Sequence, residues 1–207
     1  MPLVDKSVRD LLHAFSSGEP TPGGGSAAAL SSAIGASLLL MVAGLPKTRH
    51  GTDADRDSLA KVVSGLEPIR QSLTDAIDAD TGAYDRVTAA YKLPKATDEH
   101  KDARTRAIQL ALRAATDVPL GVVRLSEAAL REAVIVAAHG HRAAASDVGV
   151  AVALLRAGAR GARLNVEINV GSVSDPAFAA DAAADLSRVS EEAARAADAA
   201  DTRLRDG

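Results

Sequence analysis

Hydrophobic residues recur every three or four positions along most of the chain, which is the spacing of one face of an α-helix. The longest such stripe lies between Asp55 and Tyr91. Pro68 falls inside it and predicts a kink or a division of the helix, because proline lacks the N–H that a helix interior needs. One position breaks the pattern, since the residue that should continue the apolar face after Ile77 is Asp80. The apolar members of the stripe are Leu59, Val62, Val63, Leu66, Ile69, Leu73, Ile77, Tyr84, Val87 and Tyr91.

The same spacing predicts helices in most of the remaining chain. The stretch Leu164–Val170 alternates like a strand, so the pattern leaves open whether the helix that begins at Ser146 extends beyond Ala157 as far as Asn169. These helices are expected over Asp5–Ser17, over Ser26–Leu45 with Ser26 as the cap, from Thr97 to Gly140 with a break at Pro119, from Ser146, and from Asp175 to the C-terminus.

The segment Ser26–Leu45 contains no charged residue and is long enough to span a bilayer. However, it is rich in Ala, Ser and Gly, and no aromatic residues flank it as they would at a membrane interface. A helix that is apolar on all sides also suits the centre of a bundle. We therefore expect a buried core helix and no membrane association.

Composition narrows the class of protein. The chain has 207 residues, 45 of them Ala, and no Cys, which favours closely packed helices and excludes disulfides and thiol chemistry. With 24 Lys and Arg against 27 Asp and Glu, nucleic acid is not an expected partner. Met1–Lys6 does not resemble a secretory segment, so a cytoplasmic location is expected. We predict one all-α domain over residues 1–207, an up-and-down bundle of about six helices, some long and kinked.

Asp80 is the strongest candidate for chemistry. A carboxyl group on the buried face of a helix is costly unless it is paired, and burial raises its pKa towards the range useful for acid–base catalysis. An interhelical ion pair with Arg104, Arg106 or Arg113 is an equally good interpretation. Asp78 is the weaker candidate, because two residues correspond to about 200° around a helix.

The loop Pro20–Ser26 (PTPGGGS) is the second candidate. Three glycines expose backbone N–H groups just before a helix begins, and such a helix start attracts anionic or electron-rich ligand groups. The loop lacks the Lys of a phosphate-binding P-loop, and no strand precedes it as in a dinucleotide fold. A simple turn between helices is the alternative.

Other polar positions carry weaker signals. Asn165 and Asn169 would share a helix face, where they would bind either a polar heterocycle or a neighbouring helix. Lys92 and Lys95, or Lys47 and Arg49, would suit a carboxylate ligand. The histidines are scattered without a third ligand at a recognisable spacing, so no metal site is expected.

Several motifs together resemble a known family. They are Ser7-Val8-Arg9, PTPGGGSAAAL from Pro20, IDADTGAYDRVTAAYKLPK from Ile77, ATDVPL from Ala115, SDVGVA from Ser146 and ARLNVEINV from Ala162. In this order they look like the cyclodeaminase domain of formiminotransferase-cyclodeaminase and the related bacterial methenyltetrahydrofolate cyclohydrolases. The combination is specific, and it covers nearly the whole chain.

The resemblance implies an all-helical homodimer that acts on the one-carbon unit of tetrahydrofolate, with no cofactor or metal beyond that substrate. It implies that Asp80, and secondarily Asp78, are the catalytic residues. The glycine loop matches the family's folate-binding loop. By this resemblance the substrate-binding residues are Pro22, Gly23, Gly24, Gly25, Ser26, Lys92, Lys95, Ser146, Asp147, Asn165 and Asn169.

Two departures from the family pattern leave the one-carbon substituent open. Family members often carry Thr-x-Gly followed by Lys or Arg after the apolar helix, where this chain has Lys47-Thr48-Arg49-His50-Gly51, and here His141 replaces the Asn that often follows Gly140. No formiminotransferase domain accompanies these 207 residues, which favours the cyclohydrolase reaction over the cyclodeaminase reaction. A non-catalytic folate-binding or scaffolding protein of the same fold is the alternative.

Overall fold

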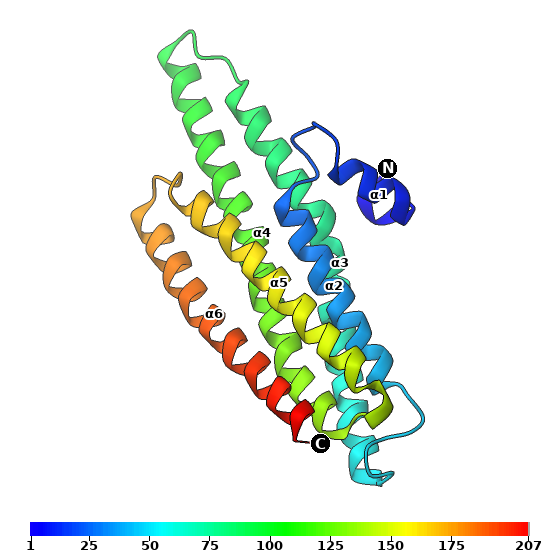
Figure 1. Ribbon diagram of the computed structural model, residues 1–207. Helices are drawn as coiled ribbons and strands as arrows, with labels where there is room; N and C mark the ends of the chain where they lie inside the picture. Colours follow the sequence, from blue (N-terminus) through cyan, green and yellow to red (C-terminus); the bar gives the residue numbers. More distant parts are fainter. Residues whose placement is uncertain (207) are drawn as a thin grey trace.

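The computed structural model describes residues 1–206 as an all-helical bundle (Figure 1). A short 3₁₀ turn, Leu3–Asp5, precedes the first helix, and a second, Arg142–Ala144, precedes the fifth. The six α-helices are α1 (Val8–Phe15), α2 (Gly24–Ala43), α3 (Asp53–Tyr91), α4 (Asp98–His139), α5 (Ala145–Val170) and α6 (Pro176–Arg205).

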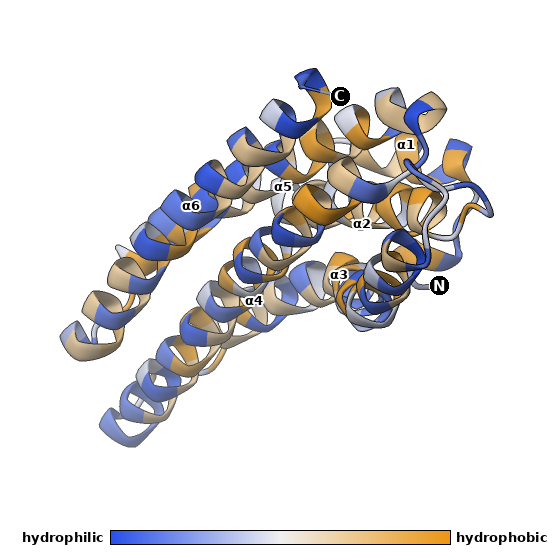
Figure 2. Ribbon diagram, turned by 90° about the horizontal axis from the view of Figure 1, so that it is seen from below, coloured by the Kyte–Doolittle hydropathy of each residue, from blue (hydrophilic) through white to orange (hydrophobic). Residues whose placement is uncertain are grey.

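Helix α2 lies at the centre of the packing and contacts α3, α4 and α5, while α6 covers α4 and α5 (Figure 1). Eleven of the 20 residues of α2 are buried. It is also the helix long and apolar enough to cross a membrane, and Figure 2 shows its hydrophobic character beside the more polar α4 and α6. Its place between three other helices agrees with the prediction of a core helix.

Helices α2 and α5 run in opposite directions, and small residues allow them to approach closely. A Cβ atom added to Gly158 would come within 2.0 Å of the Ser32 hydroxyl, and one added to Gly35 within 2.8 Å of the Ala151 carbonyl oxygen. The Ser31 hydroxyl donates to the Leu154 carbonyl at 2.8 Å, which fastens the same pair. The high alanine and glycine content therefore serves helix packing, as composition indicated.

The predicted break at Pro119 is wrong, because α4 continues through it. A proline at 119 leaves the Ala115 carbonyl without its helical donor. The side-chain amide of Asn169, on α5, donates to that oxygen at 2.7 Å. The neighbouring helix thus supplies the missing hydrogen bond. Helix α3 likewise runs through Pro68 without division.

Other boundaries differ from the predictions by a few residues. Helix α2 begins at Gly24 with Gly23 in the capping position, so Ser26 is not its cap but lies in its first turn. Helix α5 continues to Val170, so the alternating stretch Leu164–Val170 is helical. Thr97 and Asp175 cap α4 and α6 through their side chains, so these two helices begin where the sequence predicted.

Candidate functional site

Asp80 lies against the N-terminus of α2. Its Oδ2 accepts hydrogen bonds from the Ser26 backbone N–H at 2.8 Å and from the Ser26 hydroxyl at 3.2 Å. The same hydroxyl lies 2.8 Å from the Ile77 carbonyl and 3.3 Å from Thr81 Oγ1. Ser26 therefore joins the start of α2 to the middle of α3 and holds one oxygen of the carboxyl group.

The second oxygen of the Asp80 carboxyl group, Oδ1, has no hydrogen-bond donor within residues 1–206. Oδ1 accepts no hydrogen bond from the residues that the structure describes, and Asp80 forms no ion pair with any of them. The predicted alternative of an interhelical ion pair is wrong for this structure, since Arg113 pairs with Asp175 and Arg104 stacks on Tyr91. Burial raises the pKa of Asp80 above its ordinary value, and the hydrogen bonds from Ser26 oppose that rise.

Gly25 makes the close approach possible. A Cβ atom added there would come within 2.0 Å of Asp80 Oδ1. Pro22 and Gly23 are half-buried in the loop that leads into the helix. The backbone N–H groups of Gly24 and Gly25 donate no hydrogen bond within residues 1–206. The glycine loop thus brings two unpaired backbone donors and a carboxyl group to one place.

The two asparagines of α5 have different surroundings. Asn165 lies beside the loop, with its Nδ2 3.8 Å from a Cβ atom built on Gly24 and 2.9 Å from the Gly161 carbonyl that it bonds. Asn169 instead donates to Ala115 of α4. The structure therefore brings Asn165 to the site and gives Asn169 the helix–helix role that was the alternative interpretation.

Asp78 does not face the glycine loop. Its carboxylate accepts hydrogen bonds from the backbone N–H groups of Leu3 at 2.6 Å and Val4 at 3.4 Å. It therefore fastens the N-terminal turn to α3. Lys92 and Lys95 are exposed just beyond the end of α3, and Lys92 is twelve residues, or about 18 Å, along the helix from Asp80.

Ser146 and Asp147 lie at the opposite end of the bundle. They begin α5, whereas Asn165 near its other end lies beside Gly24, so nineteen residues or about 28 Å of helix separate Ser146 from the loop. Neither side chain forms a hydrogen bond or ion pair with the part of the chain that the structure describes. Within one chain, the predicted site is divided between the two ends of α5.

A second polar cluster, which the sequence analysis missed, lies at that far end. Asp55, only 2 % exposed, places Oδ1 2.8 Å from His139 Nδ1 and 3.4 Å from His50 Nδ1. Its Oδ2 accepts from the His50 backbone N–H at 2.8 Å and the Thr48 hydroxyl at 3.2 Å. The hydrogen bond with His139 is the main cause that lowers the pKa of Asp55 well below its ordinary value. In the sequence, only the polar loop Pro46–Asp53 indicated a cluster here. Asp55 and its partner His139 are 84 residues apart, so the sequence alone did not connect them.

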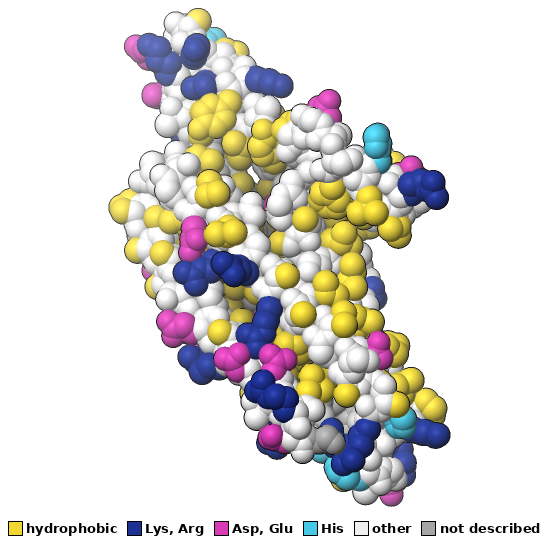
Figure 3. Space-filling model, in the orientation of Figure 1, with side chains coloured by type: hydrophobic (Ala, Val, Ile, Leu, Met, Phe, Trp, Pro, Cys, Tyr) yellow, Lys and Arg dark blue, Asp and Glu magenta, His cyan; other side chains and the backbone are white. Residues whose placement is uncertain are grey.

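Tyr84 and Tyr91 were expected in the core but are 45 % and 51 % exposed. Tyr84 lies one helical turn beyond Asp80 on the same side of α3. An exposed aromatic ring beside a catalytic candidate offers a stacking surface for a planar ligand. A shallow hollow is visible beside the N-terminal loop in Figure 3.

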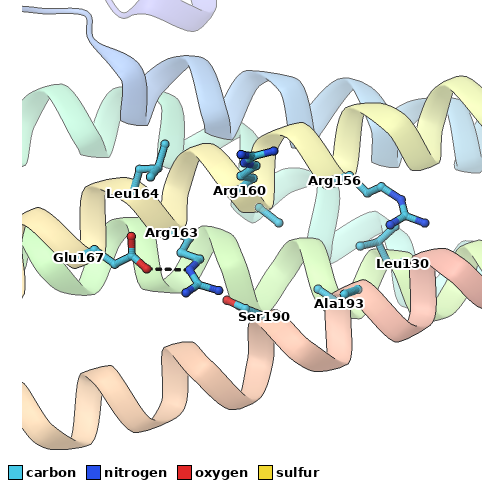
Figure 4. A pocket seen from close by; sticks show the side chains of 10 residues that line it. Leu130, Arg156, Arg160, Arg163, Leu164, Glu167, Ser190 and Ala193 are labelled. Carbon is cyan, nitrogen blue, oxygen red and sulfur yellow. Dashed lines mark hydrogen bonds and ion pairs between the residues drawn. The ribbon is translucent and has the colours of Figure 1, made fainter.

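A cavity of about 540 Å³ lies elsewhere, between α5 and α6 (Figure 4). Its lining includes Arg156, Arg160, Arg163 and Glu167, and none of the predicted site residues. Arg163 is paired with Glu167 and Arg156 with Asp198 and Asp201, so most of this charge is neutralised within the chain. The cavity does not coincide with the arrangement around Asp80.

The fold and the site define a helical bundle in which a partly buried carboxyl group faces a glycine-rich helix start. The chain belongs to the formiminotransferase-cyclodeaminase family, whose model matches residues 7–188. It is 43 % identical over 175 residues to a methenyltetrahydrofolate cyclohydrolase from Methylorubrum extorquens, covering 84 % of each chain. It is 34 % identical to the formimidoyltransferase-cyclodeaminase of Sus scrofa over 92 % of this chain, but spans only 35 % of that relative.

A solved structure agrees with these matches. The crystal structure of formiminotetrahydrofolate cyclodeaminase from Thermotoga maritima superposes with a TM-score of 0.86, covering 98 % of this chain and 97 % of that one at 25 % identity. The predicted family and all-helical fold are thereby confirmed.

Proposed function

We propose that this chain is a folate one-carbon enzyme that hydrolyses 5,10-methenyltetrahydrofolate to 10-formyltetrahydrofolate. The observation that carries the proposal is Asp80, a partly buried carboxyl group with one oxygen held by Ser26 and the other free beside the glycine loop. The named activities of the relatives act on the same one-carbon unit. An enzyme is therefore favoured over a scaffolding protein.

The chemistry requires a group that both accepts and donates a proton. Water adds to the methenyl carbon between N5 and N10, and the Asp80 carboxylate accepts one proton of that water. The C–N5 bond then breaks, N5 receives a proton from the Asp80 carboxyl group, and the remaining O–H proton is released as the formyl group forms on N10. The raised pKa of Asp80 suits this exchange, because a weaker acid is a better base at neutral pH.

The surrounding residues hold the substrate in this proposal. The free N–H groups of Gly24 and Gly25 bind an electron-rich edge of the folate ring, Asn165 contributes its amide, and Tyr84 stacks on the ring. The exposed ammonium groups of Lys92 and Lys95 suit the carboxylates of the glutamyl tail. No cofactor beyond the tetrahydrofolate substrate has a step in this scheme.

Formimidoyltetrahydrofolate cyclodeaminase is the second candidate. In that reaction N10 attacks the formimidoyl carbon on N5 and ammonia leaves, so the same carboxyl group serves. The structural match to a cyclodeaminase supports it. The cyclohydrolase is favoured because the relative with that name shares 43 % identity over most of both chains, against 34 % for the porcine bifunctional relative.

One experiment separates the candidates. Purified protein is supplied in turn with 5,10-methenyl- and 5-formimidoyltetrahydrofolate, and methenyl absorbance is followed after subtraction of the uncatalysed rates. We expect enzyme-dependent loss of absorbance with the first substrate and little gain with the second. A gain with the second and no loss with the first would establish the cyclodeaminase. Tight folate binding without conversion of either substrate would show that the chain is a folate-binding protein and not an enzyme of this kind.

We further propose a homodimer built on the outer faces of α2 and α5. The exposed side of α2 carries Ala27, Ile34 and Met41, and the adjoining side of α5 carries Val150, Ala157, Leu164 and Ile168. Exposed apolar side chains gathered on one side of the molecule are typical of an interface. In Figure 3 charged side chains gather along the border between α5 and α6 and at the ends of the bundle. The molar mass in solution, measured by light scattering, tests the proposal.

A further inference from the structure

One hydroxyl group next to Asp80 lacks the partner that its place on a helix would give it. A threonine inside an α-helix often donates to the backbone carbonyl four residues earlier. Thr81 does not, since the only hydrogen bond of Thr81 Oγ1 within residues 1–206 is the one with Ser26 Oγ, at 3.3 Å. The threonines that follow the usual pattern are Thr74, Thr105, Thr116 and Thr202.

The carbonyl that Thr81 would use has another donor. The Ser26 hydroxyl, from the first turn of α2, lies 2.8 Å from the Ile77 carbonyl oxygen and takes the place of the Thr81 hydroxyl there. The same Ser26 hydroxyl lies 3.2 Å from Asp80 Oδ2. Thr81, Ser26 and the Asp80 carboxyl group therefore form a connected row of polar groups between α3 and α2.

The single proton of the Ser26 hydroxyl has two possible acceptors, the Ile77 carbonyl and Asp80 Oδ2. If this proton goes to Oδ2, that oxygen accepts two hydrogen bonds, because the Ser26 backbone N–H also donates to it, at 2.8 Å. Both lone pairs of Oδ2 are then occupied, so a proton that binds to the carboxylate is carried by Oδ1. Oδ1 is the oxygen that lies against Gly25 of the glycine loop.

The other arrangement places the proton where it is of no use. If the Ser26 proton goes to the Ile77 carbonyl, Ser26 Oγ faces Asp80 Oδ2 as an acceptor, and a proton on Oδ2 can donate to it. Ser26 is fully buried, so a proton held in this contact is out of reach of a substrate. The direction of the Ser26 hydroxyl thus decides which oxygen of Asp80 exchanges protons.

Thr81 favours the useful arrangement. Ser26 Oγ is the one acceptor that the Thr81 hydroxyl has within residues 1–206. A hydroxyl that accepts a hydrogen bond becomes a stronger donor, and it has one lone pair fewer for a proton on Oδ2. Because a carboxylate is a stronger acceptor than a neutral carbonyl, the Ser26 proton then turns towards the ionised Asp80.

We propose that Thr81 is a positioning residue for proton transfer, which acts through Ser26 to keep Oδ2 of Asp80 an acceptor and to leave the exchange of protons to Oδ1. In the proposed reaction Oδ1 takes one proton from the attacking water and returns it to N5 as the C–N5 bond breaks. This inference rests on the proposed function and adds to it a residue that does not contact the substrate.

Thr81→Val removes the hydroxyl and keeps a β-branched side chain of similar shape. We expect kcat for 5,10-methenyltetrahydrofolate to fall by about five- to tenfold, the effect of one neutral hydrogen bond, with KM unchanged. Thr81→Ser keeps the hydroxyl and should restore most of the wild-type kcat. The matched control is Thr74→Val, about two turns earlier on α3, because the Thr74 hydroxyl donates to the Arg70 carbonyl of its own helix. Its kcat and KM should equal those of the wild type.

A cycle of double substitutions shows whether Thr81 acts through Ser26. In the background of Ser26→Ala the link to Asp80 is already lost, so Thr81→Val should cause no further fall in kcat. An equal fall in both backgrounds would overturn the proposal, and so would a wild-type kcat for Thr81→Val. Inactivity of the wild-type protein on both folates would instead overturn the proposed function.

Infrared spectroscopy reports the position of the proton. In acid, the difference between each protein and its Asp80→Asn counterpart isolates the C=O stretch of the protonated Asp80. With the proton on Oδ1, the C=O oxygen is Oδ2, and its two hydrogen bonds from Ser26 lower the wavenumber of the band. In Thr81→Val, part of the band should move to higher wavenumber, because Oδ1 becomes the C=O oxygen and has no donor within residues 1–206. An unshifted band would contradict the proposal.

Discussion

Two carboxyl groups, those of Asp55 and Asp80, lie near opposite ends of α2, and they differ in hydrogen bonding and in the direction of their pKa shift. Both oxygens of Asp55 are occupied, by two histidines, a hydroxyl and a backbone N–H, and its pKa is lowered. Only one oxygen of Asp80 is occupied, by Ser26, and its pKa is raised. A carboxylate with complete hydrogen bonding stabilises the fold, whereas one left incomplete retains capacity for proton transfer.

The largest expected effect is on turnover at the Asp80 end. Asp80→Asn keeps an oxygen that can accept from Ser26 but cannot exchange a proton, so kcat should fall by about 10²–10⁴-fold. Because burial raises the pKa of Asp80, its ionised form costs stability once the pH rises through the folded-state pKa. The melting temperature of Asp80→Asn at pH 7 should therefore be unchanged or higher.

Absorbance kinetics with methenyltetrahydrofolate and a thermal melt measure both quantities. Asp80 is not the acid–base group if the variant turns over at the wild-type rate. A large fall in melting temperature would make Asp80 a structural residue like Asp55.

The second-largest expected effect is a loss of kcat/KM on substitution of Gly25. The added methyl group of Gly25→Ala needs the space of Asp80 Oδ1, so the carboxyl group must move and kcat/KM should fall by about 100-fold. Gly121→Ala is the matched control, since nothing lies within 4 Å of a Cβ atom at that position in α4. Equal activities of the two variants would show that the position of Asp80 is not critical.

At the other end, the expected effect is on stability. Asp55→Asn removes the charge that holds His139 and His50, so the melting temperature at pH 7 should fall by about several degrees. Because the folded-state pKa of Asp55 is below its ordinary value of 3.8, its contribution is present above that value and is lost as the pH falls below about 4. Urea titrations at pH 7 and pH 3.5 should therefore show a difference between wild type and variant that shrinks in acid.

Asp55→Asn also tests the contrast between the ends. Its effect on turnover should be no larger than its loss of folded protein explains. An Asp55→Asn protein as stable as the wild type at pH 7 would refute the structural role of this cluster.

The site at the Asp80 end could largely be predicted from the sequence, whereas the cluster at the Asp55 end could not. Asp80 was found because it interrupts a regular apolar stripe on its own helix, and the glycine loop because three glycines precede a helix. The Asp55 cluster was not found, because its members come from the Pro46–Asp53 loop, the first turn of α3 and the end of α4, and Asp55 and His139 are 84 residues apart. Helix boundaries followed local capping at Thr97 and Asp175, but the continuity of α4 depended on a bond from another helix.

The smallest expected effect concerns that bond and separates the two asparagines of α5. Asn169→Ala leaves the Ala115 carbonyl without a donor and should lower the free energy of unfolding by about 1–2 kcal/mol, with KM for the folate unchanged. In the background of Pro119→Ala, which returns a backbone N–H to that carbonyl, the same substitution should cost less, and urea denaturation of the four proteins measures the difference. An increase in KM without loss of stability would instead move Asn169 into the substrate site with Asn165.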